Sequence, residues 1–378
     1  MESHGTLKCE RVSAEGASYL EISAPGRHRA RFASLGLCHV PTQLEVLSRL
    51  SEVAEGPPLA VKRDDCTGLA GGGNKARKLD LALAPAVEGG FDTLVTYGAL
   101  QSNHARQTAA AAAKLGLECR LVLEDRVNIA SASYRESGNR LLTQLLGGEV
   151  ADIVSSGTAK EAARNLAEEL RRRQRRPYLV PAGASSPLGA LAYAACGTEI
   201  EWQSRELGIP VDAIFTCVGS GGTLAGLAVA TAYWQEPPKL FGVSSGSVGG
   251  ASVEQVRDLA MAAAKLARLD PQVVRARARL EIVSQMPSYG AVDAEICEAI
   301  ALAARYEGLI LDPVYSGRTF ATLLSAIRAG YLKDSKGVVF LHTGGMPAVF
   351  AYGSKNLLWD HSFPQEEVAM AVPPPMSI

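Results

Sequence analysis

The sequence lacks an excess of charge of either sign. Its 378 residues hold 38 lysines and arginines against 39 aspartates and glutamates, which gives a formal net charge of −1. A nearly neutral chain offers no electrostatic basis for binding nucleic acid or an anionic membrane surface. The one dense basic run, residues 171–176, follows two glutamates and is typical of a solvated helix C-terminus. We therefore expect neither nucleic acid nor a membrane as a partner.

Paired cysteines and long apolar runs are missing as well. The seven cysteines are odd in number and include no Cys-x-x-Cys pair, which argues against a disulfide framework or a zinc site. Residues 1–5 provide no apolar core for a signal sequence, and no hydrophobic run approaches the length that spans a membrane. With 47% hydrophobic and 20% charged residues, the composition is that of a globular protein. We expect a cytoplasmic protein without a metal site.

Short apolar runs alternate with alanine-rich stretches from about Val61 onward. Continuous apolar runs indicate strands that are buried on both faces, as in parallel sheets covered by helices. The expected strands are residues 94–97, 119–123, 177–181, 213–218, 240–244 and 337–341. The pattern predicts an α/β fold with mainly parallel sheets. Residues 1–30 are weakly patterned and are interpreted as a peripheral extension.

Ligands of such sheets bind beyond the carboxyl ends of the strands, where loops lead into helices. Four loops in these positions are rich in glycine or small polar residues: 71–75, 98–104, 219–223 and 343–345. These loops are where we expect the chemistry of the protein.

The loop Gly219-Ser220-Gly221-Gly222-Thr223 lies between an apolar run and a helical stretch. Glycines let the backbone approach an anion, N–H groups at a helix start converge on it, and the two hydroxyls add donors. The loop lacks the ending of a nucleotide-binding P-loop and the spacing of the dinucleotide fingerprint. It indicates either a phosphate cup of another kind or a tight structural turn.

Lys75 follows three glycines and Asn74 at the start of an expected helix, with Arg77 and Lys78 just inside it. A lysine among cations and partly removed from water has a lowered pKa, which Schiff-base chemistry requires. The structural alternative is an ordinary solvated lysine on a surface loop.

Ser102, Asn103 and His104 open another expected helix. Free N–H groups at a helix start suit a carboxylate, and these side chains add hydrogen bonds. Helix capping by Ser102 or Asn103 is the alternative, and it leaves His104 unexplained. Farther along, Tyr315 is either a buried phenol or a proton donor, and Thr343 is compatible with a simple turn.

Taken together and in this order, the motifs resemble those of pyridoxal-phosphate enzymes of the tryptophan-synthase β fold. The resemblance is greatest to the D-cysteine desulfhydrase and 1-aminocyclopropane-1-carboxylate (ACC) deaminase family. The matching segments are 61–65, 72–79, 101–108, 219–223, 311–315 and 342–345. The resemblance runs from about residue 31 to about residue 352 and implies pyridoxal 5′-phosphate as the cofactor.

The same resemblance implies two three-layer αβα domains with mainly parallel, twisted sheets. A large cofactor domain would comprise residues 31–76 and 190–352, and a small domain residues 77–189. An N-terminal extension, 1–30, and a C-terminal tail, 353–378, would lie outside them. The resemblance also implies a homodimer.

Position by position, the resemblance implies roles around the cofactor. Lys75 would hold it as a Schiff base and move the substrate α-proton, and Asn103 would lie beside its phenolic oxygen. The 219–223 loop, with Gly219, Ser220, Gly221, Gly222 and Thr223, would hold the phosphate. Thr343 would face the pyridine nitrogen, and because threonine is neutral, the ring would act as a weaker electron sink.

The resemblance also implies roles around a small amino-acid substrate. Ser102, Asn103 and His104 would receive its carboxylate. Tyr289 and Tyr315 would form a pair of active-site tyrosines that assist the leaving group. We count Ser102 and both tyrosines, with the Schiff-base lysine, as the catalytic residues.

These positions predict a lyase that performs α,β-elimination on D-cysteine or a cysteine analogue and releases pyruvate, ammonia and sulfide. ACC deaminases resemble one another in having glutamine in place of His104 and glutamate in place of Ser316, so ring opening is the second hypothesis. The segment 183–187 departs from the family's usual Gly-Gly-Ser-Asn, which leaves β-replacement open. A cofactor-free binding protein is the alternative from another class.

Overall fold

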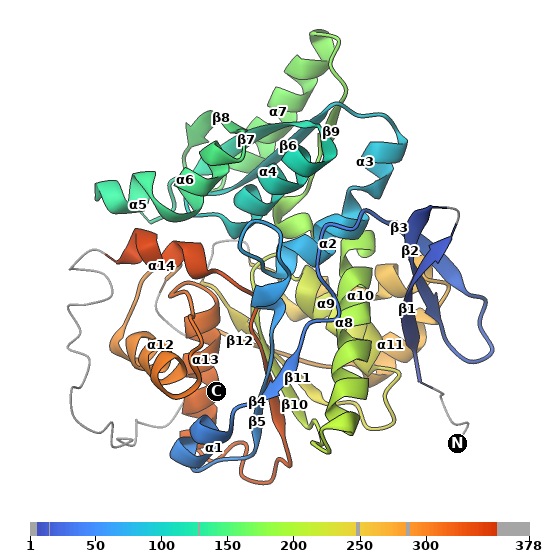
Figure 1. Cartoon of the computed structure of the whole chain (residues 1–378), viewed down its shortest axis with the longest axis vertical. Helices are drawn as coiled ribbons and strands as arrows, with labels where there is room; N and C mark the ends of the chain where they lie inside the picture. The colour runs from blue at the N-terminus through green and yellow to red at the C-terminus, as the bar shows by residue number, and fades with distance from the viewer. Residues whose placement is uncertain (1–5, 15, 128, 247–249, 285–287, 354–378) are drawn as a thin grey trace.

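The fold was obtained as a computed structural model that describes residues 6–14, 16–127, 129–246, 250–284 and 288–353. Two sheets dominate it (Figure 1). The larger has six strands in the order β12-β11-β10-β13-β5-β4, and the smaller has four in the order β8-β7-β6-β9. All neighbouring strands in both sheets are parallel, except that β4 at one edge is antiparallel to β5. The predicted α/β class with mainly parallel sheets is confirmed.

The strands of these sheets and of a small antiparallel sheet, β1-β2-β3, are short. They are β1 (Lys8–Ala14), β2 (Ala17–Ser23), β3 (Ala30–Ser34), β4 (Leu44–Val46), β5 (Leu59–Lys62), β6 (Thr93–Ala99), β7 (Glu118–Glu124), β8 (Gly148–Val154), β9 (Pro177–Leu179), β10 (Ala213–Val218), β11 (Lys239–Ser244), β12 (Arg279–Val283) and β13 (Val338–Leu341).

Helices connect most of the strands. They are α1 (Ser48–Ala54), α2 (Asn74–Ala82), α3 (Ala84–Glu88), α4 (Asn103–Leu115), α5 (Ala132–Glu136), α6 (Gly138–Leu145), α7 (Ala159–Arg172), α8 (Pro187–Glu206), α9 (Gly222–Thr231), α10 (Val253–Leu266), α11 (Pro271–Arg277), α12 (Ala294–Glu307), α13 (Ser316–Arg328) and α14 (Met346–Tyr352), with the 3-10 turns η1 (Asp64–Cys66) and η2 (Ala182–Ala184).

Helices cover both faces of the six-stranded sheet. Successive side chains of a strand point to opposite faces, so the apolar run of β13 serves two cores. Val339 packs with residues of α8, α9 and α10, whereas Phe340 packs with residues of α1, α12 and α13. This explains why the strand is apolar at every position.

The four-stranded sheet is also a middle layer, and it forms the upper part of the molecule in Figure 1. Val95 and Val122 pack against the alanines of α7, while Leu94 and Leu121 pack with α2 and α4 on the opposite face. The two sheets support the division into a large and a small domain, whose exact limits remain a prediction.

Two features of the fold carry no strong sequence pattern. Strands β8 and β12 lie at sheet edges, where their residues are partly exposed, so they lack the continuous apolar run of central strands. Within the N-terminal region, strands β1 and β2 pair with each other, and Leu20 and Ile22 are buried in the core that contains α8. This packing integrates residues of the expected extension with the rest of the fold.

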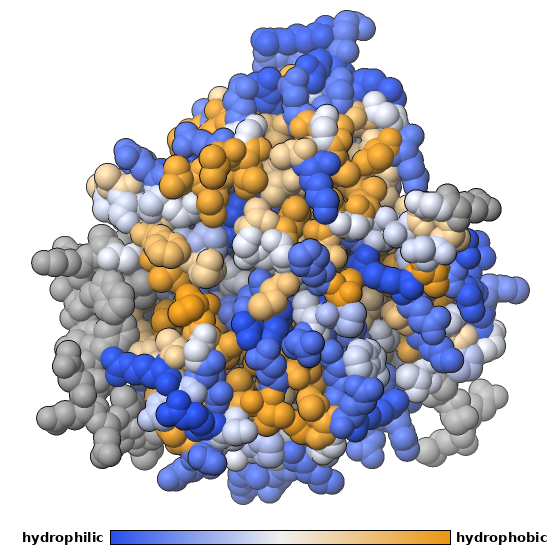
Figure 2. All heavy atoms as spheres, viewed as in Figure 1, coloured by the Kyte–Doolittle hydropathy of each residue, from blue (hydrophilic) through white to orange (hydrophobic). Residues whose placement is uncertain are grey.

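The surface agrees with the balanced charge of the sequence. In Figure 2 the tip of the molecule, where α7 ends in Figure 1, is hydrophilic, and its last turn carries the exposed Arg171 and Arg172. Apolar residues are visible on the same face below this tip. Among the described residues, no helix is long and apolar enough to cross a membrane, and no cluster of three or more His, Cys, Asp or Glu side chains forms a metal site.

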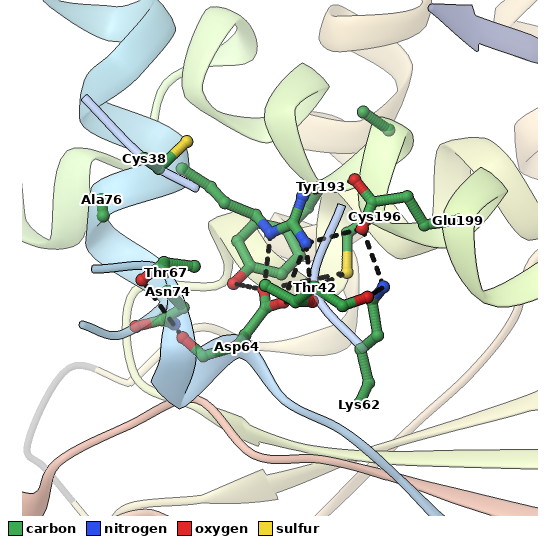
Figure 3. A network of polar contacts seen from close by, with 12 residues as sticks. Cys38, Thr42, Lys62, Asp64, Thr67, Asn74, Ala76, Tyr193, Cys196 and Glu199 are labelled. Atoms are coloured by element: carbon green, nitrogen blue, oxygen red, sulfur yellow. Dashed lines mark hydrogen bonds and ion pairs between the residues drawn. The ribbon is translucent and has the colours of Figure 1, made fainter. Parts of the chain in front are cut away.

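A buried network of charges holds the first turns of α2 (Figure 3). Arg77 of α2 donates to the Asp64 carboxylate in η1 at 2.8 and 2.9 Å and to Glu199 of α8 at 2.8 and 2.7 Å. Lys62 at the end of β5 donates to Glu199 at 2.8 Å, and the Tyr193 hydroxyl donates to Asp64 at 2.6 Å. Two cations and two carboxylates therefore compensate one another inside the protein.

The pKa of Glu199 reflects this environment. Burial by itself would raise the pKa of the carboxyl, but the charges and hydrogen bonds of Arg77 and Lys62 outweigh burial and lower it to about 2. Removing one member of such a network is costly because a buried charge is left without its partner.

We expect Glu199→Gln to lower the free energy of unfolding by about 3–5 kcal/mol at pH 7, because it leaves Arg77 and Lys62 with one carboxylate between them. The contribution of the ionised carboxylate is present above the ordinary carboxyl pKa of 4.5 and is lost as the pH falls toward about 2. The destabilisation should therefore shrink below pH 4.5. Urea unfolding at several pH values measures it.

Glu168→Gln is the matched control, because Glu168 pairs with Arg171 at the exposed end of α7. Its loss should change the free energy of unfolding by less than about 1 kcal/mol. Equal effects of the two substitutions would contradict the role assigned to the buried network.

Candidate active site

A cavity of about 370 Å³ lies between the two large sheets. Its wall is formed where β6, β7, β8, β10 and β11 end, which is the position that parallel sheets offer to ligands. The predicted site residues that line it are Lys75, Ser102, Asn103, His104, Gly219, Ser220, Gly221, Gly222, Thr223 and Tyr315. The structure thus brings together loops that are up to 240 residues apart in the sequence, from Lys75 to Tyr315.

Two predicted residues lie just behind this wall. Tyr289 contacts Tyr315, with 2.9 Å between the two hydroxyl oxygens. The Thr343 hydroxyl contacts the Cys217 thiol at 3.2 Å, and Cys217 itself lines the cavity. Both predicted residues are therefore one contact away from the space in which a ligand would bind.

The glycines before Lys75 are required by the close packing of its loop. Gly72 and Gly73 have φ values of +70° and +125°, which favour glycine. A Cβ on Gly72 would lie 1.8 Å from the Asp65 carbonyl oxygen, and one on Gly73 would lie 2.7 Å from the Gln107 amide nitrogen. This turn places Lys75 in the first turn of α2, two residues before Arg77 of the buried charge network.

The environment of Lys75 favours a neutral amine. Removal from water lowers the pKa of Lys75 and the Arg106 charge lowers it further, against the opposing influence of Cys217 and Asp312. The Lys75 Nζ atom lies 5.5 Å from the centre of the Tyr315 ring. A neutral amine is the form that attacks a carbonyl group, so the local electrostatics suit a Schiff-base lysine.

Lys78 is a further cavity residue whose role the sequence pattern did not reveal. It lies one turn after Lys75 on α2 and is buried, and its amine has no hydrogen-bond partner among the described residues. Burial and the neighbouring Lys75 charge hold the pKa of Lys78 well below its ordinary value. An anion in the cavity would relieve both effects. Lys78 follows Lys75 by three residues on a helix, and this spacing was the sequence signal that could have placed both lysines on the same face.

The 219–223 loop leads into α9 and is supported by a neighbouring turn. The Gly222 N–H donates to the Ser185 hydroxyl at 3.2 Å, and the Ser185 and Ser220 hydroxyls are 2.7 Å apart. A Cβ on Gly222 would lie 2.5 Å from the same Ser185 hydroxyl, so glycine is needed there. The Gly222 N–H is used in this contact and the Ala225 N–H donates to the Gly221 carbonyl, which leaves the N–H groups of Thr223 and Leu224 in the first turn of α9 for an anion.

Helix α4 begins with a capped turn. The Ser102 hydroxyl accepts a hydrogen bond from the Ala105 N–H at 3.1 Å, so the capping interpretation of Ser102 is correct. The Asn103 side-chain oxygen accepts from Arg106 at 3.2 Å. Ser102 and Asn103 nevertheless line the cavity at the positive end of the helix.

His104 is a neutral side chain in a fixed position. Its Nε2 lies 2.8 Å from the Thr96 hydroxyl, which donates its own proton to the Val180 carbonyl. Nε2 therefore carries the ring proton. Burial first, and then the charges of Lys75 and Lys78, lower the pKa of His104 to about 3. The ring can offer shape and polarity to a ligand, but it does not hold a positive charge near neutral pH.

Asp312 fixes the turn that carries Tyr315. This carboxylate accepts hydrogen bonds from the Val314 and Tyr315 N–H groups at 2.9 Å and from the Ser316 hydroxyl at 2.7 Å. Burial raises the pKa of Tyr289 and, together with the adjacent Tyr289, raises the pKa of Tyr315 well above its ordinary value. Both phenols therefore remain protonated and can donate a proton.

A half-buried lysine with a lowered pKa, an anion-binding loop and protonated phenols around one cavity define an enzyme that uses an aldehyde cofactor. The chain belongs to the family of pyridoxal-phosphate-dependent enzymes, because residues 36–344 match that family, described as "Pyridoxal-phosphate dependent enzyme". The expected family is thus confirmed.

Curated relatives and solved structures agree with this assignment. The chain is 40% identical over 323 residues to a D-cysteine desulfhydrase of Serratia proteamaculans, covering 85% of this chain and 97% of the relative. It is 40% identical over 324 residues to a D-cysteine desulfhydrase of Klebsiella pneumoniae, with the same coverage.

Among solved structures, an ACC deaminase homologue matches with a TM-score of 0.76 and 35% identity, covering 86% of this chain and 95% of that one. Threonine deaminase isoform 2 of Solanum lycopersicum matches with a TM-score of 0.57 and 17% identity, covering 82% and 81%, and shares the fold.

The cavity residues fit pyridoxal phosphate. The aldehyde reacts with a neutral amine, which the lowered pKa of Lys75 favours, and the phosphate suits the N–H donors of the 219–223 loop, with Lys78 on the same cavity. Asn74 adds a polar atom without a partner: its Nδ2 donates to Thr223 at 2.9 Å, while its buried Oδ1 accepts no hydrogen bond from the described residues. Such an atom indicates a missing ligand.

Lys75→Ala should abolish the visible absorption band of the lysine-bound cofactor, because the band arises from the bond between the Lys75 amine and the cofactor aldehyde. Turnover should fall by roughly a thousandfold or more. Lys160→Ala, which removes an exposed lysine on the same cavity, should keep the band. Absorption spectra of both purified variants after incubation with pyridoxal phosphate measure this, and a band retained in Lys75→Ala would refute the assignment.

Attachment of the cofactor should occur at a lower pH than for a free lysine. Because the pKa of Lys75 is lowered from its ordinary value of 10.5, its amine is neutral at a pH where free lysine is still protonated. The rate at which the band appears after cofactor is added to cofactor-free protein should therefore reach its half-maximum below that pH. A midpoint at or above the value of Nα-acetyl-lysine in the same buffers would contradict this expectation.

Proposed function

We propose that this enzyme catalyses α,β-elimination on a small amino acid such as D-cysteine and releases pyruvate, ammonia and sulfide. The observation that carries the proposal is the 2.9 Å contact of two protonated tyrosines beside Lys75, whose amine lies 5.5 Å from the Tyr315 ring. A base and a proton donor are then adjacent, as an elimination requires. The identity of 40% to D-cysteine desulfhydrases over 97% of their length supports the same reaction.

Pyridoxal 5′-phosphate, when bound, supplies an electron sink for negative charge at the substrate α-carbon. The neutral amine of Lys75 is suited to accept the α-proton once it is released from the cofactor. The start of α4, with Ser102 and Asn103, offers free N–H groups and a positive helix end to the substrate carboxylate. His104, neutral and fixed by Thr96, shapes this side of the pocket.

The tyrosine pair is proposed to donate a proton to the departing sulfur. Tyr315 borders the cavity, and its hydrogen bond with Tyr289 stabilises the phenolate that proton donation leaves. Thr343, in contact with Cys217, would offer the ring nitrogen of the cofactor a hydroxyl and no carboxylate. A neutral partner limits the stability of a carbanion and so favours rapid loss of a β-leaving group.

ACC ring opening is the second candidate, because an ACC deaminase homologue matches with a TM-score of 0.76. The position at which ACC deaminases resemble one another in having glutamate is Ser316 here. Its hydroxyl donates to Asp312 at 2.7 Å and is buried behind Tyr315, so it is not placed to protonate a substrate. This favours elimination over ring opening.

We also propose that the enzyme acts as a homodimer in the cytoplasm. The resemblance to its family supports the dimer, and seven free cysteines suit a reducing compartment. Light scattering of the holoenzyme measures the oligomeric state.

A substrate panel tests the proposed reaction. The holoenzyme should release equal amounts of pyruvate and sulfide from D-cysteine, and Tyr315→Phe should lower kcat by roughly a hundredfold. The reduction should be smaller for β-chloro-D-alanine, whose chloride leaves without a proton. Release of 2-oxobutyrate from ACC would contradict elimination and support ring opening. Products that form only in the presence of an added thiol would support β-replacement.

A further inference from the structure

One part of the cavity wall is not used by the reaction described above. It is formed by the loops after β7 and β8 and includes Glu124, Arg126, Ser156, Gly157 and Lys160. Arg126 is mostly buried, with 24% of its side chain exposed, whereas Lys160 is exposed at the rim. Glu124 neutralises one of the two cations, so the wall retains positive charge.

Arg126 is fixed in position by this wall. Its Nε donates to the Glu124 carboxylate at 2.5 Å. The other oxygen of Glu124 accepts from the N–H groups of Gly157 and Ala159, each at 3.0 Å, at the start of α7. Both Nη groups of Arg126 have no hydrogen-bond partner among the described residues. The side chain therefore presents two oriented, unused donors with a positive charge.

A continuous series of contacts links Arg126 to the reacting centre. The Arg126 guanidinium lies 5.5 Å from the centre of the Tyr289 ring, and Tyr289 contacts Tyr315 through its hydroxyl. Tyr315 in turn lies beside the Lys75 amine. Arg126 thus lines the cavity next to the tyrosine pair, which is proposed above to face the leaving group of the substrate.

We propose that Arg126 is a specificity-determining residue that binds an oxyanion at the outer end of the substrate's β-substituent. This inference rests on the proposed elimination and refines its substrate class: small amino acids whose leaving group carries a carboxylate or similar oxyanion. A guanidinium with two free, parallel donors matches the geometry of a carboxylate. In this partly buried wall the interaction is less screened than on the surface.

S-(carboxymethyl)cysteine illustrates the step. The α C–H bond and the C–S bond break, and the electron pair of the C–S bond leaves with sulfur, which takes a proton from the tyrosine pair and departs as thioglycolate. Water hydrolyses the remaining enamine to pyruvate and ammonia. No oxidant or reductant is needed, and the carboxylate on the leaving group contacts Arg126 throughout.

The kinetic test compares S-(carboxymethyl)cysteine with S-(carbamoylmethyl)cysteine, its neutral amide, with both enantiomers of each. The readout is the ratio of their kcat/KM values for pyruvate release by the holoenzyme. We expect the wild type to favour the carboxylate by roughly tenfold or more, as charge-assisted hydrogen bonds do, and Arg126→Met to bring the ratio close to one.

Arg135→Met is the matched control. Arg135 also follows β7 and pairs with Asp125, but it does not line the cavity, so the ratio should remain that of the wild type. A wild-type ratio near one, or a ratio that survives in Arg126→Met, would overturn the inference.

A binding experiment separates this inference from the proposed reaction. The probes are 2-aminoadipate and its 6-amide, in which a methylene replaces the sulfur so that no leaving group exists. Calorimetric titration of the holoenzyme should show preference for 2-aminoadipate in the wild type and Arg135→Met, and no preference in Arg126→Met.

Preference for the acid together with no pyruvate from D-cysteine or either thioether would refute elimination and retain the role of Arg126. Pyruvate release without a preference for the acid in either experiment would support elimination and refute the role of Arg126.

Discussion

The position of the reactive lysine depends on the buried ion network beneath it. Arg77 ties α2 to Asp64 in η1 and to Glu199 in α8, and Lys62 completes the charge balance from the end of β5. Four elements are thereby joined at one point, two residues along α2 from Lys75. Buried ions tolerate little displacement, because any loss of contact leaves a charge without compensation. The network consequently fixes the direction in which the lysine enters the cavity.

The cavity itself is organised by complementary protonation states. Lys75 and His104 are biased toward their neutral forms by burial and by neighbouring cations, while Tyr315 and Tyr289 are biased toward their protonated forms. A proton acceptor and proton donors therefore coexist near neutral pH. The same low polarity that shifts these groups also strengthens any interaction with a bound anion.

The central strands and the loops of the site were predictable, because each has a local signal. Buried parallel strands are continuously apolar, and close backbone packing demands glycine, as at Gly73. Side-chain direction has no such signal. The Ser102 hydroxyl turns toward the backbone of α4, and Thr343 lies behind Cys217. Arg126 belongs to no motif. Its place in the cavity depends on the tertiary fold, which brings the loops after β7 and β8 close to the tyrosine pair.

Lys78 affects the stability of the protein before the cofactor binds. Lys75 and Lys78 are neighbouring amines on the cavity, and Lys78 is buried, so their positive charges destabilise the folded chain unless an anion compensates them. A ligand that binds only the folded chain shifts folding by mass action. A phosphate group bound near these amines therefore acts as a structural counter-ion, which couples binding of the cofactor to the stability of the fold.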